Sequence, residues 1–109
     1  MALLPPRLAE GTLGTGAAPL YTAPTSPPRQ ANVVLAIFTN LDGAADRTLD
    51  YWDGTATDGR ALIRSGVLTP NGRAVNDDVI LLAPGQSVLG RADVAGMVSF
   101  QIRGTEVIG

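Results

Sequence analysis

Alternation of apolar and polar residues is clearest near the end of the chain. Between Met97 and Arg103, the residues Val98, Phe100 and Ile102 are each separated by one polar position. Successive side chains of a strand point to opposite faces, so a period of two predicts one buried and one solvated face. We therefore expect a half-exposed antiparallel strand, with these three apolar side chains in the core.

A second apolar run, from Asn32 to Thr39, carries no charge and is rich in β-branched and aliphatic residues. Such a run is typical of a central strand that is buried on both faces. We expect its side chains Val34, Leu35 and Ile37 to be largely buried.

The rest of the chain holds shorter apolar segments separated by turn sequences such as Asp53-Gly54, Asn71-Gly72 and Pro84-Gly85. The further strands predicted are Leu20–Thr22, Arg47–Asp53, Ala61–Arg64, Val79–Leu82 and Ser87–Leu89. No stretch shows a sustained helical period. Seven or eight strands, with turns about every 8 to 12 residues, predict an all-β fold: a small antiparallel β-sandwich or barrel.

Residues 1–28 hold six of the eight prolines, which makes a helix there nearly impossible. We divide the chain into an extended Pro/Gly-rich N-terminal arm, residues 1–18, and a β-sandwich domain, residues 19–109. The arm has little charge and four leucines that no periodicity organises, so we expect it to order on a neighbouring subunit. These leucines are Leu3, Leu4, Leu8 and Leu13. A disordered tail is the alternative, because chain termini are commonly loose.

Composition narrows the chemistry that 109 residues of one small domain can perform. The chain has no cysteine and no histidine, and all eight basic residues are arginine. Disulfides, zinc fingers, Ser-His-Asp triads and lysine-based catalysis are therefore excluded. A net charge of −2 argues against a basic nucleic-acid surface. We expect a non-enzymatic module without cofactor, metal or membrane, since the run Val33–Phe38 is far shorter than the roughly 20 residues of a membrane span.

The acidic residues were the remaining candidates for hydrolytic chemistry, which uses paired carboxylates. Asp42, Asp53 and Asp58 lie in or beside turns that contain glycine, where aspartate is favoured because it hydrogen-bonds its own backbone. Asp77 and Asp78 lack the alternating oxygen ligands of a calcium-binding loop. We interpret all five as turn or surface residues.

Two further residues are candidates for partner binding. The arginines form no continuous basic run but suit pairing with carboxylates of another subunit, and Arg29 lies at the end of the proline-rich stretch. Tyr51 and Trp52 are adjacent, so their rings point to opposite faces of one strand and cannot share a sugar-stacking platform. We expect one ring in the core and the other at a partly covered surface, where Trp52 is the candidate.

Several short motifs follow one another over residues 19–107. They are Leu20–Pro24, the apolar strand Val33–Phe38 ending at Thr39-Asn40, Leu62-Ile63, Leu82–Val88 and Ile102–Glu106. In this order they resemble a family of short β-sandwich proteins encoded among the structural genes of tailed bacteriophages. The proline-rich arm is longer than in the plainest members. The resemblance implies a repeated, non-catalytic component of the virion.

Within that family, the resemblance is interpreted as a capsid decoration, or cement, protein. It would be made in the host cytoplasm, bind the outer surface of the phage head as a homo-oligomer, with a trimer favoured, and stabilise that surface. Its partners would be the major capsid protein and copies of itself, with no nucleic acid and no membrane. A tail-tip or fibre module that binds a host glycan is one alternative, favoured by an uncovered aromatic near Tyr51 or Trp52. A head-tail joining or tail-terminator ring protein, whose arm plugs a neighbour, is another.

Overall fold

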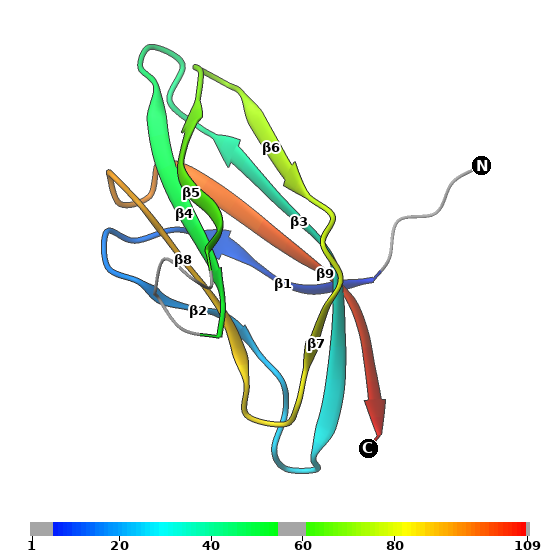
Figure 1. The fold of residues 1–109 in the computed structure, drawn as a ribbon. Coiled ribbons are helices and arrows are strands. Elements are labelled where there is room, and N and C mark those ends of the chain that lie inside the picture. Colours follow the sequence, from blue (N-terminus) through cyan, green and yellow to red (C-terminus); the bar gives the residue numbers. More distant parts are fainter. Residues whose placement is uncertain (1–5, 55–60, 109) are drawn as a thin grey trace, which may run out of the picture.

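The computed structural model describes residues 6–54 and 61–108 of the chain. Every regular element in this part of the chain is a β-strand (Figure 1). The strands are β1 (Arg7–Thr12), β2 (Ala18–Thr22), β3 (Arg29–Asn40), β4 (Arg47–Asp53), β5 (Ala61–Leu68), β6 (Arg73–Asn76), β7 (Ile80–Leu82), β8 (Ser87–Ala92) and β9 (Val98–Ile108). The predicted all-β class is confirmed, with nine strands in these residues where seven or eight were expected.

The strands form two antiparallel sheets that pack face to face (Figure 1). Sheet A has the order β1-β9-β3-β6, and β7 pairs with the same edge of β3 as β6 does. Sheet B has the order β2-β8-β4-β5. The long strands β3 and β9 pair with each other from end to end, so they form the centre of sheet A.

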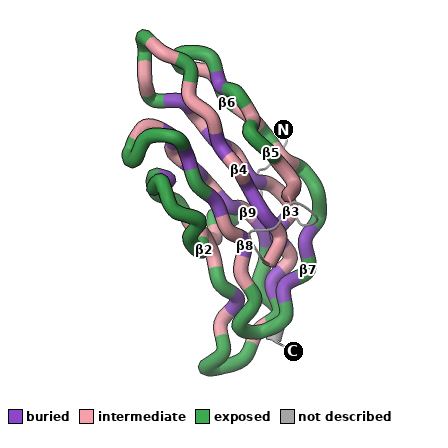
Figure 2. Tube along the Cα trace, turned by 60° about the vertical axis from the view of Figure 1, so that its left-hand side comes forward, coloured by how far each residue is buried: buried purple, intermediate pink, exposed green. Residues whose placement is uncertain are grey.

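The hydrophobic core lies between the two sheets, and along the long strands buried residues alternate mostly with residues of intermediate burial (Figure 2). Phe38 of sheet A and Tyr51 of sheet B meet edge to face across the core, with ring centroids 5.2 Å apart. A contact of this kind adds about 0.5–1.5 kcal/mol to the burial of the two rings. Val98, Phe100 and Ile102 are all buried, which confirms the alternation predicted for this strand.

Val34, Leu35 and Ile37 were predicted to be buried in the core, but all three are only partly buried and none belongs to the core cluster. The core side of β3 instead carries Ala31, Val33, Ala36 and Phe38. A β-bulge between Val33 and Leu35 moves the inward positions from odd to even residue numbers. Sheet B covers one face of sheet A, so the apolar residues on the other face of β3 stay partly exposed.

The arm predicted over residues 1–18 is corrected wherever the structure describes it. Residues 7–12 form β1, which pairs antiparallel with the free edge of β9. The sandwich therefore begins before residue 19. The segment Arg7–Thr12 has no alternation of apolar and polar residues, which is why its strand was not predicted.

Leu13, expected on a neighbouring subunit, is 1% exposed and belongs to the chain's own core. Its N–H donates to the carbonyl of Val98 at 2.8 Å, and its carbonyl accepts from the N–H of Gly96 at 3.1 Å. These bonds continue the pairing of β1 past its last residue. Leu3 and Leu4 lie outside the described residues.

Asn40, at the end of β3, is a buried polar residue with its hydrogen bonds made. Its Nδ2 donates to the carbonyls of Ala45, Leu68 and Thr69 at 3.0 to 3.1 Å, and its Oδ1 accepts from the N–H of Asp42 at 2.8 Å. A buried polar group without partners costs about 1–3 kcal/mol. The amide thus joins the β3–β4 connection to the end of β5 and closes this end of the sandwich.

Truncating Leu13 tests its place in the core. We expect Leu13→Ala to lower the free energy of unfolding of the isolated protein by about 2–5 kcal/mol, because the lost atoms leave a cavity. Urea denaturation measures this loss. Val67→Ala, at an exposed position, is the control and should change the stability by less than about 1 kcal/mol. Equal midpoints for Leu13→Ala and the parent would instead place Leu13 in an arm outside the core.

Candidate protein-interaction surface

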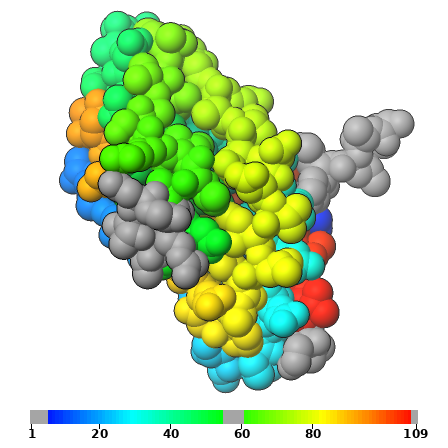
Figure 3. All heavy atoms as spheres, viewed as in Figure 1, coloured from blue at the N-terminus to red at the C-terminus, as the bar shows by residue number. Residues whose placement is uncertain are grey.

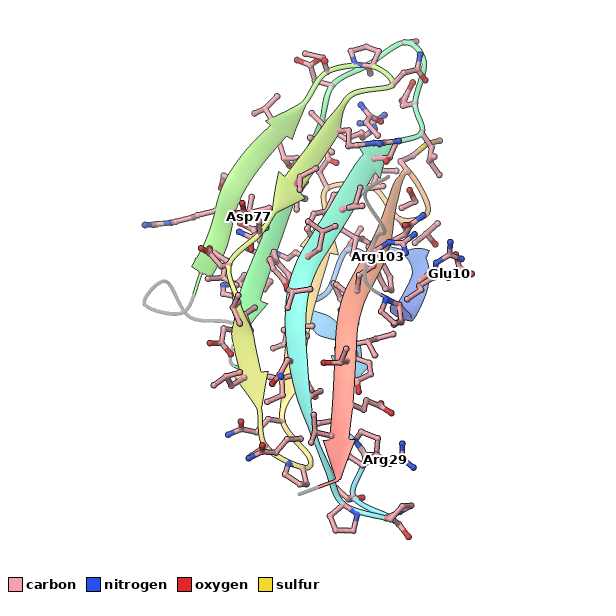
Figure 4. The ribbon with its side chains drawn as sticks, turned by 90° about the vertical axis from the view of Figure 1, so that its right-hand side faces the viewer. Glu10, Arg29, Asp77 and Arg103 are labelled. Carbon is pink, nitrogen blue, oxygen red and sulfur yellow. The ribbon has the colours of Figure 1, made fainter. Side chains whose placement is uncertain are left out.

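The outer face of sheet A, termed the A face, points away from the core and carries an apolar strip (Figure 4). Val34, Leu35 and Ile37 of β3 form its centre, and none of them packs against the core. Val75 of β6 pairs with Ile37 and is 56% exposed, and Leu81 of β7 is 72% exposed. Exposed aliphatic side chains on adjacent strands are typical of a surface that contacts protein.

Charged residues of opposite sign lie on the two borders of this strip. On the border formed by β1 and β9, Arg7 and Arg103 are Cα partners, and Nη1 of Arg7 lies 2.8 Å from Oε2 of Glu10. On the other border, Asp77 and Asp78 connect β6 to β7. Figure 4 shows Arg103 and Asp77 on either side of β3. Beside Leu35, the A face therefore carries arginine on one border and aspartate on the other, while Glu10 and Arg73 place the opposite charge further along each border.

Local hydrogen bonds hold both borders in place. Arg103 donates through Nε and Nη2 to Oε1 of Gln101 at 3.3 and 3.0 Å. On the acidic border, Nδ2 of Asn76 donates to Oδ2 of Asp78, and the N–H of Asp78 donates to Oδ1 of Asn76, both at 3.2 Å. These contacts orient the polar side chains that flank the strip.

A hollow of about 420 Å³ opens between β7, β8 and the end of β4. It is lined by Asp53, Gly54, Leu81, Gly85, Gln86, Ser87 and Leu89. Figure 3 shows the residues of β7, in yellow, at the molecular surface beside the green residues of β4 and β5. Among the described residues of this lining, Asp53 is the one titratable side chain.

Over residues 6–54 and 61–108, no three histidine, cysteine, aspartate or glutamate side chains gather as a metal site would require. These residues also contain no helix that is long and apolar enough to span a bilayer.

The outer face of sheet B, termed the B face, carries a ladder of three side chains from β4 and β8. Nε of Arg91 donates to Oδ2 of Asp50 at 2.9 Å, and the guanidinium carbon of Arg91 lies 5.2 Å from the centre of the Trp52 ring. Asp50 also accepts from the N–H of Ser65 on β5 at 2.7 Å. The ladder joins three strands, and its cation–π contact contributes about 0.5–2 kcal/mol.

Tyr51 and Trp52 lie on opposite faces of β4, as the sequence predicted. Tyr51 is in the core, where burial, followed by the charges of Asp53 and Asp78, raises its pKa. Trp52 is 5% exposed, so its ring is covered more fully than the partly covered surface we expected. With Arg91 over the ring, Trp52 serves the fold and presents little surface to a partner.

Arg29 also makes its contact within the chain. Its Nη1 lies 3.6 Å from Oε1 of Glu106, and the Tyr21 hydroxyl donates to the same carboxylate. Burial, and then the hydrogen bond and charge of Glu106, raise the pKa of Tyr21. This cluster connects β2 of one sheet to β3 and β9 of the other.

The predicted partner-binding residues are therefore placed as follows. Leu13 is in the core, and Leu8 is half-buried against it. Arg29 and Trp52 are held by Glu106 and Arg91, respectively. Leu3 and Leu4 lie outside the described residues, and the structure brings none of the other four into a common exposed patch.

The residues that sequence reasoning missed are those of the A face. Val75, Val79 and Leu81 are all exposed and are separated by even numbers of residues. That spacing is the signal of one strand face, and it was overlooked because Val79–Leu82 reads as a single buried run.

The contact between Arg91 and the only tryptophan of the chain can be tested by fluorescence. We expect Arg91→Ala to shift the Trp52 emission to longer wavelength and to increase its quenching by acrylamide, because the arginine stem and cation no longer cover the ring. The stability should fall by about 0.5–2 kcal/mol. Arg73→Ala, exposed on the other sheet, is the matched control. Identical spectra for Arg91→Ala and Arg73→Ala would contradict the B-face ladder.

Comparison with known proteins assigns no relative to this chain. It matches no protein-family model, no curated protein and no solved structure.

Proposed function

We propose that the protein is a non-enzymatic structural component of a bacteriophage virion, a capsid decoration protein that binds the outer surface of the head and stabilises it. The observation that carries this proposal is the A face, a sheet surface with exposed aliphatic side chains between charged borders. A surface of this kind is suited to adhesion to protein. The order of short motifs along residues 19–107, which resembles phage β-sandwich proteins, supports the same role.

The mechanism in this proposal is adhesion by many copies. Each copy of this 11.2 kDa domain contributes its own contact, and the contacts of many copies act together. Copies that bind the major capsid protein and each other raise the overall affinity through their high effective concentration. Leu3 and Leu4 remain our proposed contacts to a neighbouring subunit, and no cofactor, nucleic acid or membrane enters the mechanism.

The two alternative functions find less support in the described residues. A glycan-binding tail module called for an uncovered aromatic ring, whereas Tyr51 is fully buried and Trp52 nearly so. A head-tail or tail-terminator ring called for a long arm that plugs a neighbour. Residues 7–13 are instead paired and packed within the chain's own sandwich.

The proposal is tested by adding the purified protein to phage heads assembled without it. We expect the protein to sediment with the heads at saturation in hundreds of copies, and to raise the temperature at which the heads release their DNA. Saturation at six or twelve copies would favour the ring or tail function. No sedimentation with heads would contradict a decoration role.

A double variant distinguishes the proposed contact of Leu3 and Leu4 from non-specific hydrophobic adsorption to the heads. Leu3→Asp combined with Leu4→Asp should weaken head binding by about tenfold or more, since a buried leucine contributes about 1.5–3 kcal/mol. Leu41→Asp, at an exposed position on the β3–β4 connection, is the control and should bind like the parent.

A further inference from the structure

We propose that the A face is a homodimer interface, in which a second copy of the chain packs face to face with its two-fold axis parallel to β3. This inference goes beyond the virion role and does not depend on it. It assigns the A face to the contact between copies, which leaves other surfaces of the molecule for the phage head. It rests on the apolar strip, on the arrangement of charge along its two borders, and on the size of the face.

The apolar strip supplies the centre of such an interface. Leu35 and Ile37 lie on β3 in the middle of sheet A, and Val75 pairs with Ile37 on the neighbouring strand. Protein interfaces bury their most apolar residues at the centre and keep polar residues at the rim. The A face has this layout, because Glu10, Arg103 and Asp77 lie at its borders (Figure 4).

The charged borders are in register with each other across β3. Arg103 is the Cα partner of Leu35 on the β9 side. On the opposite side, Asn76 is the Cα partner of Ala36, so Asp77 follows at the level of Leu35. Arg103 and Asp77 therefore flank the same point of the apolar strip, and Figure 4 shows them on its two sides.

The two-fold axis follows from this register. An axis that brings one face against an identical face lies in the plane of the interface. If the axis runs parallel to β3, the basic border of one copy lies against the acidic border of the other, and each residue keeps its position along the strand direction. Arg103 of each copy then faces Asp77 of the other. An axis perpendicular to β3 would place arginine against arginine and aspartate against aspartate. Like charges across an interface are unfavourable, so the parallel axis is selected.

The charge pattern also favours a second copy over an unrelated partner. A uniformly acidic partner would repel Asp77 and Asp78, and a uniformly basic partner would repel Arg7 and Arg103. A surface with both borders, in matched register, is complementary to itself. An isologous contact needs only this self-complementarity.

The face is large enough for a stable pair. The twelve residues of β3 span about 40 Å, and four strands are about 15–19 Å wide. Because β1, β6 and β7 are shorter than β3 and β9, the face covers roughly 600 Å² per copy, so a pair would bury about 1,200 Å², at the lower end of specific interfaces. Aligned packing of two twisted sheets is a common arrangement, and it keeps the two β3 strands within about 30° of each other.

The first experiment measures the mass of the purified protein by sedimentation equilibrium over a range of concentrations. We expect reversible formation of a species of twice 11.2 kDa. Leu35→Asp should be monomeric at every concentration, while its circular dichroism and thermal transition show that it is folded. Val67→Asp, exposed on the B face, is the control and should dimerise like the parent. A parent that stays monomeric, forms a trimer, or forms a dimer insensitive to Leu35→Asp would overturn the proposal.

The second experiment tests the direction of the axis by exchanging charges. Arg103→Asp and Asp77→Arg should each weaken dimerisation about tenfold or more, because each variant places like charges together twice per dimer. The double variant restores opposite charges and should dimerise within about threefold of the parent. Asp46→Arg, exposed on the β3–β4 connection, is the control for net charge. A double variant weaker than either single variant would contradict the parallel axis.

Discussion

The pairing of β3 with β9 is the interaction on which the rest of the structure depends. These two strands run together from Arg29 to Asn40, and every other strand of sheet A attaches to one of them. β1 uses the outer edge of β9, while β6 and β7 share the outer edge of β3. Their inward residues, with Phe38 against Tyr51, form half of the core that holds sheet B in place.

The bulge in this pair determines what the protein presents to its surroundings. Between Val33 and Leu35 the core-facing positions of β3 change from odd to even residue numbers. Val34, Leu35 and Ile37 therefore all stay outside the core. Along the other edge of β3, the edge away from β9, the pairing passes from β6 to β7 beside the same residues. Asp77 lies in the connection between these two strands. The two irregularities lie beside the same stretch of β3, and the proposed contact with a second copy uses both the apolar strip and its acidic border.

Local patterns in the sequence predicted the fold class and the face of β9, because strict alternation and turn residues act over a few neighbouring positions. They could not place Arg7–Thr12, whose strand is created by the free edge of β9 and not by its own periodicity. They also assigned Val34, Leu35 and Ile37 to the core, because an apolar run does not reveal how many of its faces are covered. Leu13, Arg29 and Trp52 were assigned to partners, although each contacts residues far away in the sequence.

Replacement of Gly104 tests the central role of the β3–β9 pair most directly. A Cβ atom at this position would lie 1.9 Å from the carbonyl oxygen of Asn32, so the two backbones must separate to admit it. We expect Gly104→Ala to lower the free energy of unfolding by at least about 3 kcal/mol in urea denaturation, at the upper end of the cost of overpacking. Gly14→Ala, where nothing lies within 4 Å of the added atom, should stay within about 1 kcal/mol of the parent. A Gly104→Ala variant as stable as Gly14→Ala would contradict the close approach of β3 and β9 on which this account rests.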